Sequence, residues 1–415
     1  MALVRFKSTV SQLHKNAAMI DDVVSSIAGT LLIQARDFRG DSGQYEPMDV
    51  SEFFEIMEAR RAARLETLVQ EYRTIGDSFL LKVEEVVAKT ATGYSPMLTA
   101  YYSFWEKKMY NAIVQMILSS MAVLMGMLQC KDSQPLFKLT ILLNGKDLSI
   151  NPSLTDIDKF IAKGMRSIAE SAKLFVRWMN GTCIKTDPQV LNEDEEPFIF
   201  SFYQDISQNP EIVKLTLSLT TMTNRVFNLT NKYLDGWRRY DKSLGLWNPK
   251  RKQQIEKLRP TCGNLDQAMG YFQGTRETAE AQPAMKDIDF LQIDVSTVAV
   301  GVAKQAEVWK CEYGVALHSN SSVLYHKLSA RITQLEEQIA SDTMDIDQLK
   351  FVLNVIAEIV AMVQEVELDI ADITERYRTL KRYNIAVPAE EMELAMGIDG
   401  RWKALYIQAR TRDLR

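Results

Sequence analysis

The side chains that could do chemistry are few in this chain and stand far apart. Its three histidines are His14, His318 and His326. The last two are separated by eight residues, about two turns of a helix, so a shared metal site would need further ligands between them. No residue there has the spacing of a zinc ligand. We therefore expect the histidines to be structural.

The cysteines do not form a recognisable framework. They are Cys130, Cys183, Cys262 and Cys311, too scattered for a set of disulfides or a zinc site, and this usage fits a reducing compartment. Cys311 and His318 are near in sequence, but no cysteine or serine stands in a nucleophile motif. Nucleophilic catalysis is therefore not predicted.

The sequence also lacks the glycine-rich loops that hold phosphates. The one candidate, around Gly145, carries a single glycine and matches neither the phosphate-loop nor the dinucleotide pattern. Asp342, Asp345 and Asp347 are spaced like the start of a calcium loop, but its glycine and terminal glutamate are missing. Capping of the helix that follows explains them better. We predict no catalytic, metal-binding or cofactor-binding residue and no cofactor in this segment. An enzyme would need a pocket of converging titratable groups.

Composition favours long helices. The chain has 415 residues, 46% of them apolar, with only 18 glycines and 11 prolines, which suits about two to four helical units better than sheets with many turns. The net charge of −5 and the lack of a basic face argue against nucleic acid as a partner. Residues 1–7 lack the apolar run of a signal peptide. Because helical patterns run up to both ends, we expect a segment of a longer protein.

One segment decides between a membrane protein and a helical scaffold. Five aromatic residues fall between Tyr101 and Tyr110, and the stretch from Asn111 to Cys130 carries no charge. Its apolar residues recur at helical spacing nearly all round, so either lipid or other helices must surround it. Polar residues such as Gln115 and Ser119 interrupt it, and no second segment of that length exists. A membrane span is therefore the weaker interpretation.

Turn signals divide the chain into five predicted segments. They are the end of a preceding helical bundle (1–40), a bundle with the aromatic-led helix (41–133), a β-hairpin with a helix and an acidic loop (134–205), a bundle (206–290) and a last bundle (291–415). The predicted class is mainly α, with successive helical bundles and one small antiparallel hairpin.

The hairpin prediction rests on one dipeptide. Asn144 and Gly145 stand between two apolar runs, which is the strongest short-range signal for a hairpin. We expect both to be central turn residues with positive φ. The segment Phe198–Phe202 has strand composition and could join this small sheet.

The most regular apolar stripe runs from Ile346 to Tyr383, and we expect it to be a core helix. Its members are Leu349, Val352, Leu353, Ile356, Ile359, Val360, Val363, Val366, Ile370, Ile373, Tyr377 and Leu380. Large aromatic side chains fill the joints of bundles more often than they bind partners. The predicted core residues are Tyr102, Trp105, Trp178, Trp237, Trp309, Ile356, Tyr377 and Trp402.

Several short motifs occur in an order typical of one family. They are Tyr101–Glu106, Pro135–Lys138, Asn151–Leu154, Phe175–Trp178, Tyr233–Trp237, Glu375–Leu380 and Trp402–Leu405. With this succession the chain resembles the tail of dynein heavy chains over nearly its whole length, least so in residues 1–40 and 250–290. The form of Arg177–Ile184 is most similar to axonemal outer-arm chains of the gamma type.

The resemblance implies a fold and a role. Dynein tails are elongated strings of helical bundles that assemble with intermediate chains, light chains and other heavy chains. They attach to the docking complex or to the doublet microtubule. The implied locations are the cytoplasm, the cytoskeleton and the axoneme of a cilium or flagellum. The ATP-hydrolysing AAA+ ring lies C-terminal to the tail, so the expected function is a non-catalytic scaffold that passes force to the motor, without nucleic acid or membrane. The alternative is a free-standing α-solenoid adaptor or tethering protein unrelated to motors.

Overall fold

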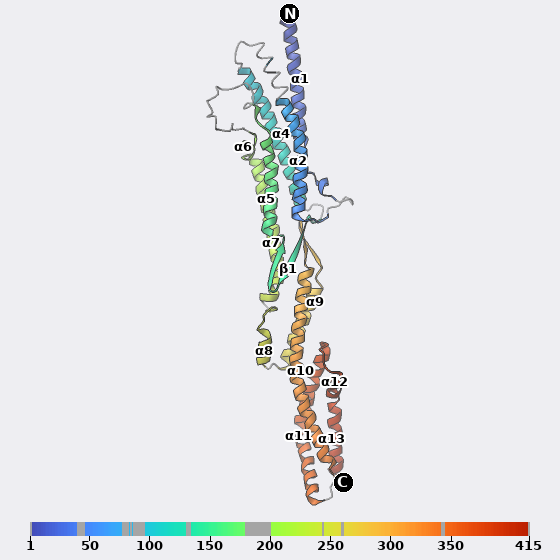
Figure 1. Ribbon diagram of the computed structural model, residues 1–415. Coiled ribbons are helices and arrows are strands. Elements are labelled where there is room, and N and C mark those ends of the chain that lie inside the picture. Colours follow the sequence, from blue (N-terminus) through green and yellow to red (C-terminus); the bar gives the residue numbers. More distant parts are fainter. Residues whose placement is uncertain are drawn as a thin grey trace, which may run out of the picture. The chain divides into compact units, whose positions relative to one another are not determined.

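The computed structural model describes residues 2–39, 46–76, 83, 85, 96–129, 134–178, 201–242, 245–258, 261–341 and 345–413. Within these ranges the chain is mostly helical and has one small sheet (Figure 1). The predicted mainly α class is confirmed.

Contacts divide the chain into two compact units. Unit 1 comprises Met1–Trp237 and Ala284–Val295, and unit 2 comprises Arg238–Pro283 and Ser296–Arg415. The finer division into five segments stays a prediction.

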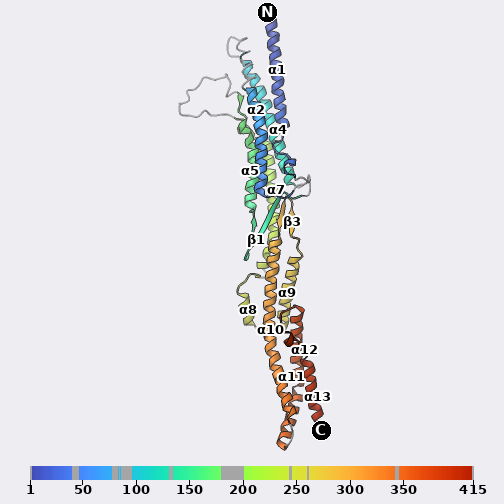
Figure 2. The same cartoon turned by 45° about the vertical axis from the view of Figure 1, so that its right-hand side comes forward.

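Unit 1 is a bundle in which α4 packs against α1, α5 and η1. Its helices are α1 (Ala2–Gly29), η1 (Ala35–Phe38), α2 (Val50–Thr74), α4 (Pro96–Leu128), α5 (Leu154–Glu170), η3 (Ser171–Leu174), α6 (Tyr203–Ile206) and most of α7 (Pro210–Lys242). Figures 1 and 2 show α1 and α4 side by side.

The aromatic-led helix α4 lies inside this bundle. The predicted stripe is buried throughout: Tyr102, Trp105, Met109, Ala112, Ile113, Met116, Leu124 and Leu128. By length and composition alone, Ala100–Leu128 is the one helix among the described residues that could cross a membrane. Because protein covers its stripe, the structure favours the core-helix interpretation, as the sequence does.

Two sets of polar contacts, one from Arg64 and one from Ser120, fix the turn that follows α1. The guanidinium of Arg64 on α2 donates to both carboxylate oxygens of Asp37, at 2.8 Å each, and to the carbonyl oxygen of Leu32 at 3.0 Å. The hydroxyl of Ser120 on α4 accepts from the amide of Leu32 at 2.9 Å. Burial raises the pKa of Asp37, but the hydrogen bonds and charge of Arg64 outweigh it and hold that pKa below its usual value.

The sheet has four strands in the order β2-β1-β4-β3. They are β1 (Phe137–Asn144), β2 (Asp147–Asn151), β3 (Met285–Ile288) and β4 (Leu291–Asp294). Antiparallel pairs join β1 to β2 and β3 to β4, whereas β1 and β4 run parallel.

The predicted β1–β2 hairpin is confirmed, but its turn was placed one residue too early. Asn144 pairs with Asp147, so the central residues are Gly145 and Lys146. Of these, only Gly145 has a positive φ, of 62°. Glycine at the first central position, followed by a residue with negative φ, is typical of a type II′ turn.

The other strand prediction was wrong in the part that the structure describes. Ser201 bridges Val176 and not the hairpin, while residues 198–200 lie outside the described residues. The sheet is extended instead by β3 and β4, two strands that the sequence pattern does not predict. Each has only four residues, too few to establish an alternating pattern.

Unit 2 is built on the long helix α10, against which α9, α11 and α13 pack. Its helices are α8 (Arg251–Leu258), α9 (Cys262–Glu280), α10 (Ser296–Ala340), α11 (Ile346–Arg382), α12 (Ala389–Met396) and α13 (Ile398–Asp413), with the last residues of α7. The predicted capping of α11 is confirmed for Asp345, whose carboxylate accepts from the amide of Ile346 at 2.7 Å.

The stripe predicted for α11 was too wide. Leu349, Leu353 and Val360 are exposed, whereas Val355, which is not in the stripe, is buried. The buried face is therefore centred further toward Val355 than the sequence pattern suggests. An apolar residue at helical spacing does not reveal which side of a broad stripe meets a neighbouring helix.

Candidate functional site: the helical core of unit 2

Within the described ranges, the reactive residue types form no metal site. No group of three or more His, Cys, Asp or Glu among the described residues is arranged to hold a metal ion. His14 and His326 are exposed. Cys262 and Cys311 are free thiols whose pKa burial raises, so both stay protonated at neutral pH. The other two cysteines lie outside the described residues.

His318 belongs to a polar cluster that joins α10, α11 and α12. The carboxylate oxygen Oε1 of Glu391 accepts from the hydroxyl of Tyr377 at 2.5 Å and lies 3.2 Å from Nε2 of His318. The hydroxyl of Ser322 also bonds to Glu391. Tyr377 is completely buried. Such a cluster holds three helices together, because each partner would leave another polar group unsatisfied if it were removed.

The environment of Glu391 keeps it ionised. Burial pushes the pKa of its carboxyl up, but the hydrogen bonds from Tyr377, Ser322 and His318 outweigh burial and leave the pKa below its usual value. Burial, reinforced by the bond to Glu391, raises the pKa of Tyr377 far above neutral pH. The carboxylate and the neutral phenol are therefore both stable partners at neutral pH.

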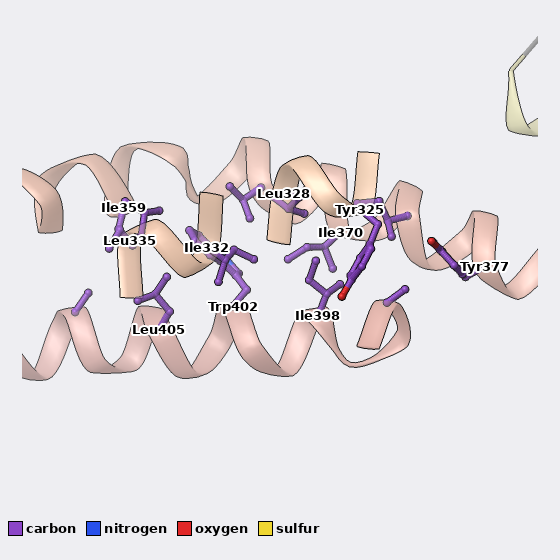
Figure 3. Close-up of a cluster of buried hydrophobic side chains, with 14 of the residues drawn as sticks. Tyr325, Leu328, Ile332, Leu335, Ile359, Ile370, Tyr377, Ile398, Trp402 and Leu405 are labelled. Carbon is purple, nitrogen blue, oxygen red and sulfur yellow. The ribbon is translucent and has the colours of Figure 1, made fainter. Parts of the chain in front are cut away.

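Figure 3 shows the apolar core that α10, α11 and α13 share. Its labelled members are Tyr325, Leu328, Ile332 and Leu335 on α10, Ile359, Ile370 and Tyr377 on α11, and Ile398, Trp402 and Leu405 on α13. Trp402 is 2% exposed and lies beside Ile332 in this view. A buried aromatic ring of this size contributes more apolar area than any aliphatic neighbour.

Next to Trp402, Arg401 sets the position of α13 along α10. Its guanidinium bonds in bidentate fashion to the carboxylate of Glu336. It also donates to the hydroxyls of Thr333, at 2.7 Å, and Ser329, at 3.2 Å. The three acceptors stand at helical spacing on one face of α10. Because a planar fork fits one arrangement of acceptors, the contact favours one register of the two helices.

A close approach also fixes the segment after α11. A Cβ atom on Gly314 of α10 would lie only 2.3 Å from Cδ1 of Ile385, so glycine is required for this packing. Nearby, the indole of Trp309 bonds to the carbonyl oxygen of Leu246. These contacts hold Ile385 and Leu246, which both lie outside the helices, against α10.

All eight predicted core residues are buried, none more than 7% exposed. Four lie in unit 1 and four in unit 2, so they form no single site: Tyr102, Trp105, Trp178 and Trp237, then Trp309, Ile356, Tyr377 and Trp402. Only Tyr377 is also part of the polar cluster. Sequence reasoning missed Glu391 and Arg401, because their α10 partners are 65 to 73 residues away in the chain and no spacing signal connects them.

No known protein-family profile matches the chain, but individual curated proteins do. It is 34% identical to the dynein-1-alpha heavy chain of the flagellar inner arm I1 complex of Chlamydomonas reinhardtii, over 95% of this chain. It is 32% identical to human dynein axonemal heavy chain 10, over 98% of this chain. The chain is a homologue of axonemal dynein heavy chains. It spans only 8% and 9% of the length of these two relatives.

The resemblance to dynein heavy chains is therefore confirmed, but the gamma subtype is not supported. The gamma chain of the Chlamydomonas reinhardtii flagellar outer arm is 22% identical over 97% of this chain, well below the other two relatives. The subtype prediction rested on the short motif Arg177–Ile184, too little to outweigh identity over the whole chain. The predicted localisation, cytoskeleton and axoneme, agrees with these relatives, which are named as axonemal or flagellar chains.

Proposed function

We propose that this chain is a non-catalytic scaffold segment in the tail of an axonemal dynein heavy chain, in the axoneme of a cilium or flagellum. The observation that carries the proposal is the identity of 32–34% to two such heavy chains over 95–98% of this chain. Hydrolysis of ATP belongs, in this proposal, to other parts of the heavy chain. The partners would be intermediate and light chains, other heavy chains and the docking complex or doublet microtubule.

The arrangement of unit 2 supports a mechanical role. Helices α10 and α11 have 45 and 37 residues, each rising about 1.5 Å per residue. Long helices owe most of their stability to packing, and buried residues extend along both, from Val298 to Ile339 on α10 and from Val352 to Leu380 on α11. A load along these helices is therefore borne by a packed core. Arg401 and the Glu391 cluster resist sliding.

The test uses the full-length heavy chain that contains this segment, with Trp402→Ala on α13. Ile407→Ala, on the exposed side of the same helix at 63% exposure, is the matched control. We expect Trp402→Ala to lower the recovery of the heavy chain in isolated axonemes and the speed of microtubule sliding. The ATPase activity per molecule should remain, and Ile407→Ala should behave as wild type.

Three outcomes would contradict the proposal. A loss of ATPase activity equal to the loss of sliding would place catalysis in this segment. Hydrogen exchange would show whether Trp402→Ala loosens the core of unit 2. If the core is loosened but assembly and sliding are normal, the segment carries no load. A reading frame that ends with this segment would favour the α-solenoid adaptor instead.

A further inference from the structure

Unit 2 has a groove between α10 and α11 that no other described element of unit 2 fills. Its volume is about 610 Å³. The floor consists of Leu328, Val366 and Ile373, with Leu324 and Met362 partly exposed at its sides. An apolar floor along two packed helices is the kind of surface that receives a third helix.

The groove continues the path of α9. Helix α9 packs along α10. The first turns of α9 also contact the end of α11, where the hydroxyl of Tyr383 donates to the carbonyl oxygen of Asp266 at 3.3 Å. The start of α9, at Cys262, lies close enough to Asp372 and Arg376 for both charges to act on the thiol. Asp372 also lines the groove. The groove thus lies next to the first turn of α9, along the same pair of helices.

The two walls of the groove carry opposite charge. On α11, Glu365 and Asp369 are exposed, and neither has an ion-pair partner in the described part of the chain, whereas Asp372 pairs with Arg376 at 2.8 Å. On α10, Lys327 is exposed and likewise has no ion-pair partner among the described residues. The wall formed by α11 is therefore acidic, and the wall formed by α10 carries the positive charge of Lys327.

We propose that this groove binds an amphipathic helix of a partner protein, with lysine or arginine on the edge that faces α11. Apolar residues at positions i, i+4 and i+7 of that helix would cover the floor, as Leu265, Met269 and Phe272 of α9 cover the neighbouring part of α10. A second copy of this chain fits worse, because two identical grooves face to face would bring their acidic walls together. The inference concerns unit 2 alone and holds whether or not the chain acts as a dynein scaffold.

The probe is a synthetic amphipathic peptide with a leucine stripe, lysines on one edge and glutamates on the other, labelled for fluorescence anisotropy. A second peptide has the same composition in scrambled order. We expect the first to bind the 415-residue chain and the scrambled one not to bind. The double variant Glu365→Lys with Asp369→Lys should weaken binding by roughly tenfold or more, because two attractions become repulsions. Binding should also weaken as salt is raised.

The matched control is Glu337→Lys with Glu393→Lys, the same charge change at exposed positions that do not line the groove. It should bind the peptide as wild type does, and circular dichroism should show that both double variants are folded. Equal binding by wild type and the groove variant would overturn the proposal, as would no binding of the amphipathic peptide at all. Dimerisation of the free chain that Glu365→Lys abolishes would assign the groove to a second copy and also overturn it.

Discussion

Ile356 and Leu353 test whether packing holds α11 in place. Both belong to the apolar stripe that the sequence predicts, but Ile356 is 4% exposed and Leu353 is 45% exposed. Replacing either with alanine removes three carbon groups, each contributing about 0.8 kcal/mol when fully buried. For Ile356 nearly all of this transfer energy is lost, about 2.4 kcal/mol, and an enclosed cavity adds to it. We expect Ile356→Ala to cost about 2–5 kcal/mol.

Leu353→Ala should cost far less. About half of this side chain is in water already, so the transfer energy lost is about 1 kcal/mol, and solvent fills the space that the side chain leaves. The two variants change the same number of atoms on one helix only three residues apart. A difference of about 2 kcal/mol or more between them therefore measures burial and not a general effect of alanine.

Hydrogen exchange measured by mass spectrometry is the suitable assay, because the chain has two compact units and global unfolding need not be a single transition. A loss of about 3 kcal/mol should accelerate exchange in α11 peptides by on the order of a hundredfold. Equal, small changes in both variants would refute the packing argument. Glu358 is a poor control, because it pairs with Arg331 across α10 and α11 and can contribute up to about 1 kcal/mol.

Three further predictions concern substitutions, and a fourth concerns nucleotide binding by the chain. Gly145→Val should destabilise the β1–β2 hairpin by about 1–3 kcal/mol, because Gly145 has a φ of 62°, and an unchanged melting temperature would contradict this. Gly314→Ala should lower the melting temperature through overpacking, whereas Gly274→Ala, with nothing near the added carbon, should raise stability by about 0.5–1 kcal/mol. Because the folded pKa of Glu391 lies below its unfolded value, its stabilisation is present above the unfolded pKa and is lost as the pH falls through the folded one. Glu391→Gln should therefore destabilise the chain at pH 7 but lose less stability on acidification than wild type, and parallel melting curves against pH would refute this. Calorimetry should detect no ATP binding to the 415-residue chain, and micromolar affinity would show that the missing phosphate loop is a misleading signal.

The elements with long periodic patterns could be predicted from the sequence. The stripe of α4 and the start of α11 at Asp345 match the structure, because a helical repeat over many turns and a capping residue are local properties. The pairing of β1 with β4 could not be predicted, since about 150 residues separate the strands and β4 is only four residues long. Burial along α11 was predicted only in part. The apolar spacing along α11 showed that one side of the helix is apolar. It did not show that the edge near Val355, and not the edge with Leu349 and Leu353, is the buried one.

The polar contacts of unit 2 explain more about its role than its apolar core does. Apolar packing is non-directional, so a helix displaced by one turn along its neighbour would regain much of the buried area. The bonds of Arg401 to Glu336, Thr333 and Ser329 would all be lost in such a displacement, and so would the bonds of Tyr377 to Glu391. A buried partner left unpaired costs more than the intact bond contributes, and this asymmetry penalises each wrong register. Stability and register therefore have different physical origins here, and the proposed transmission of load along these helices needs both.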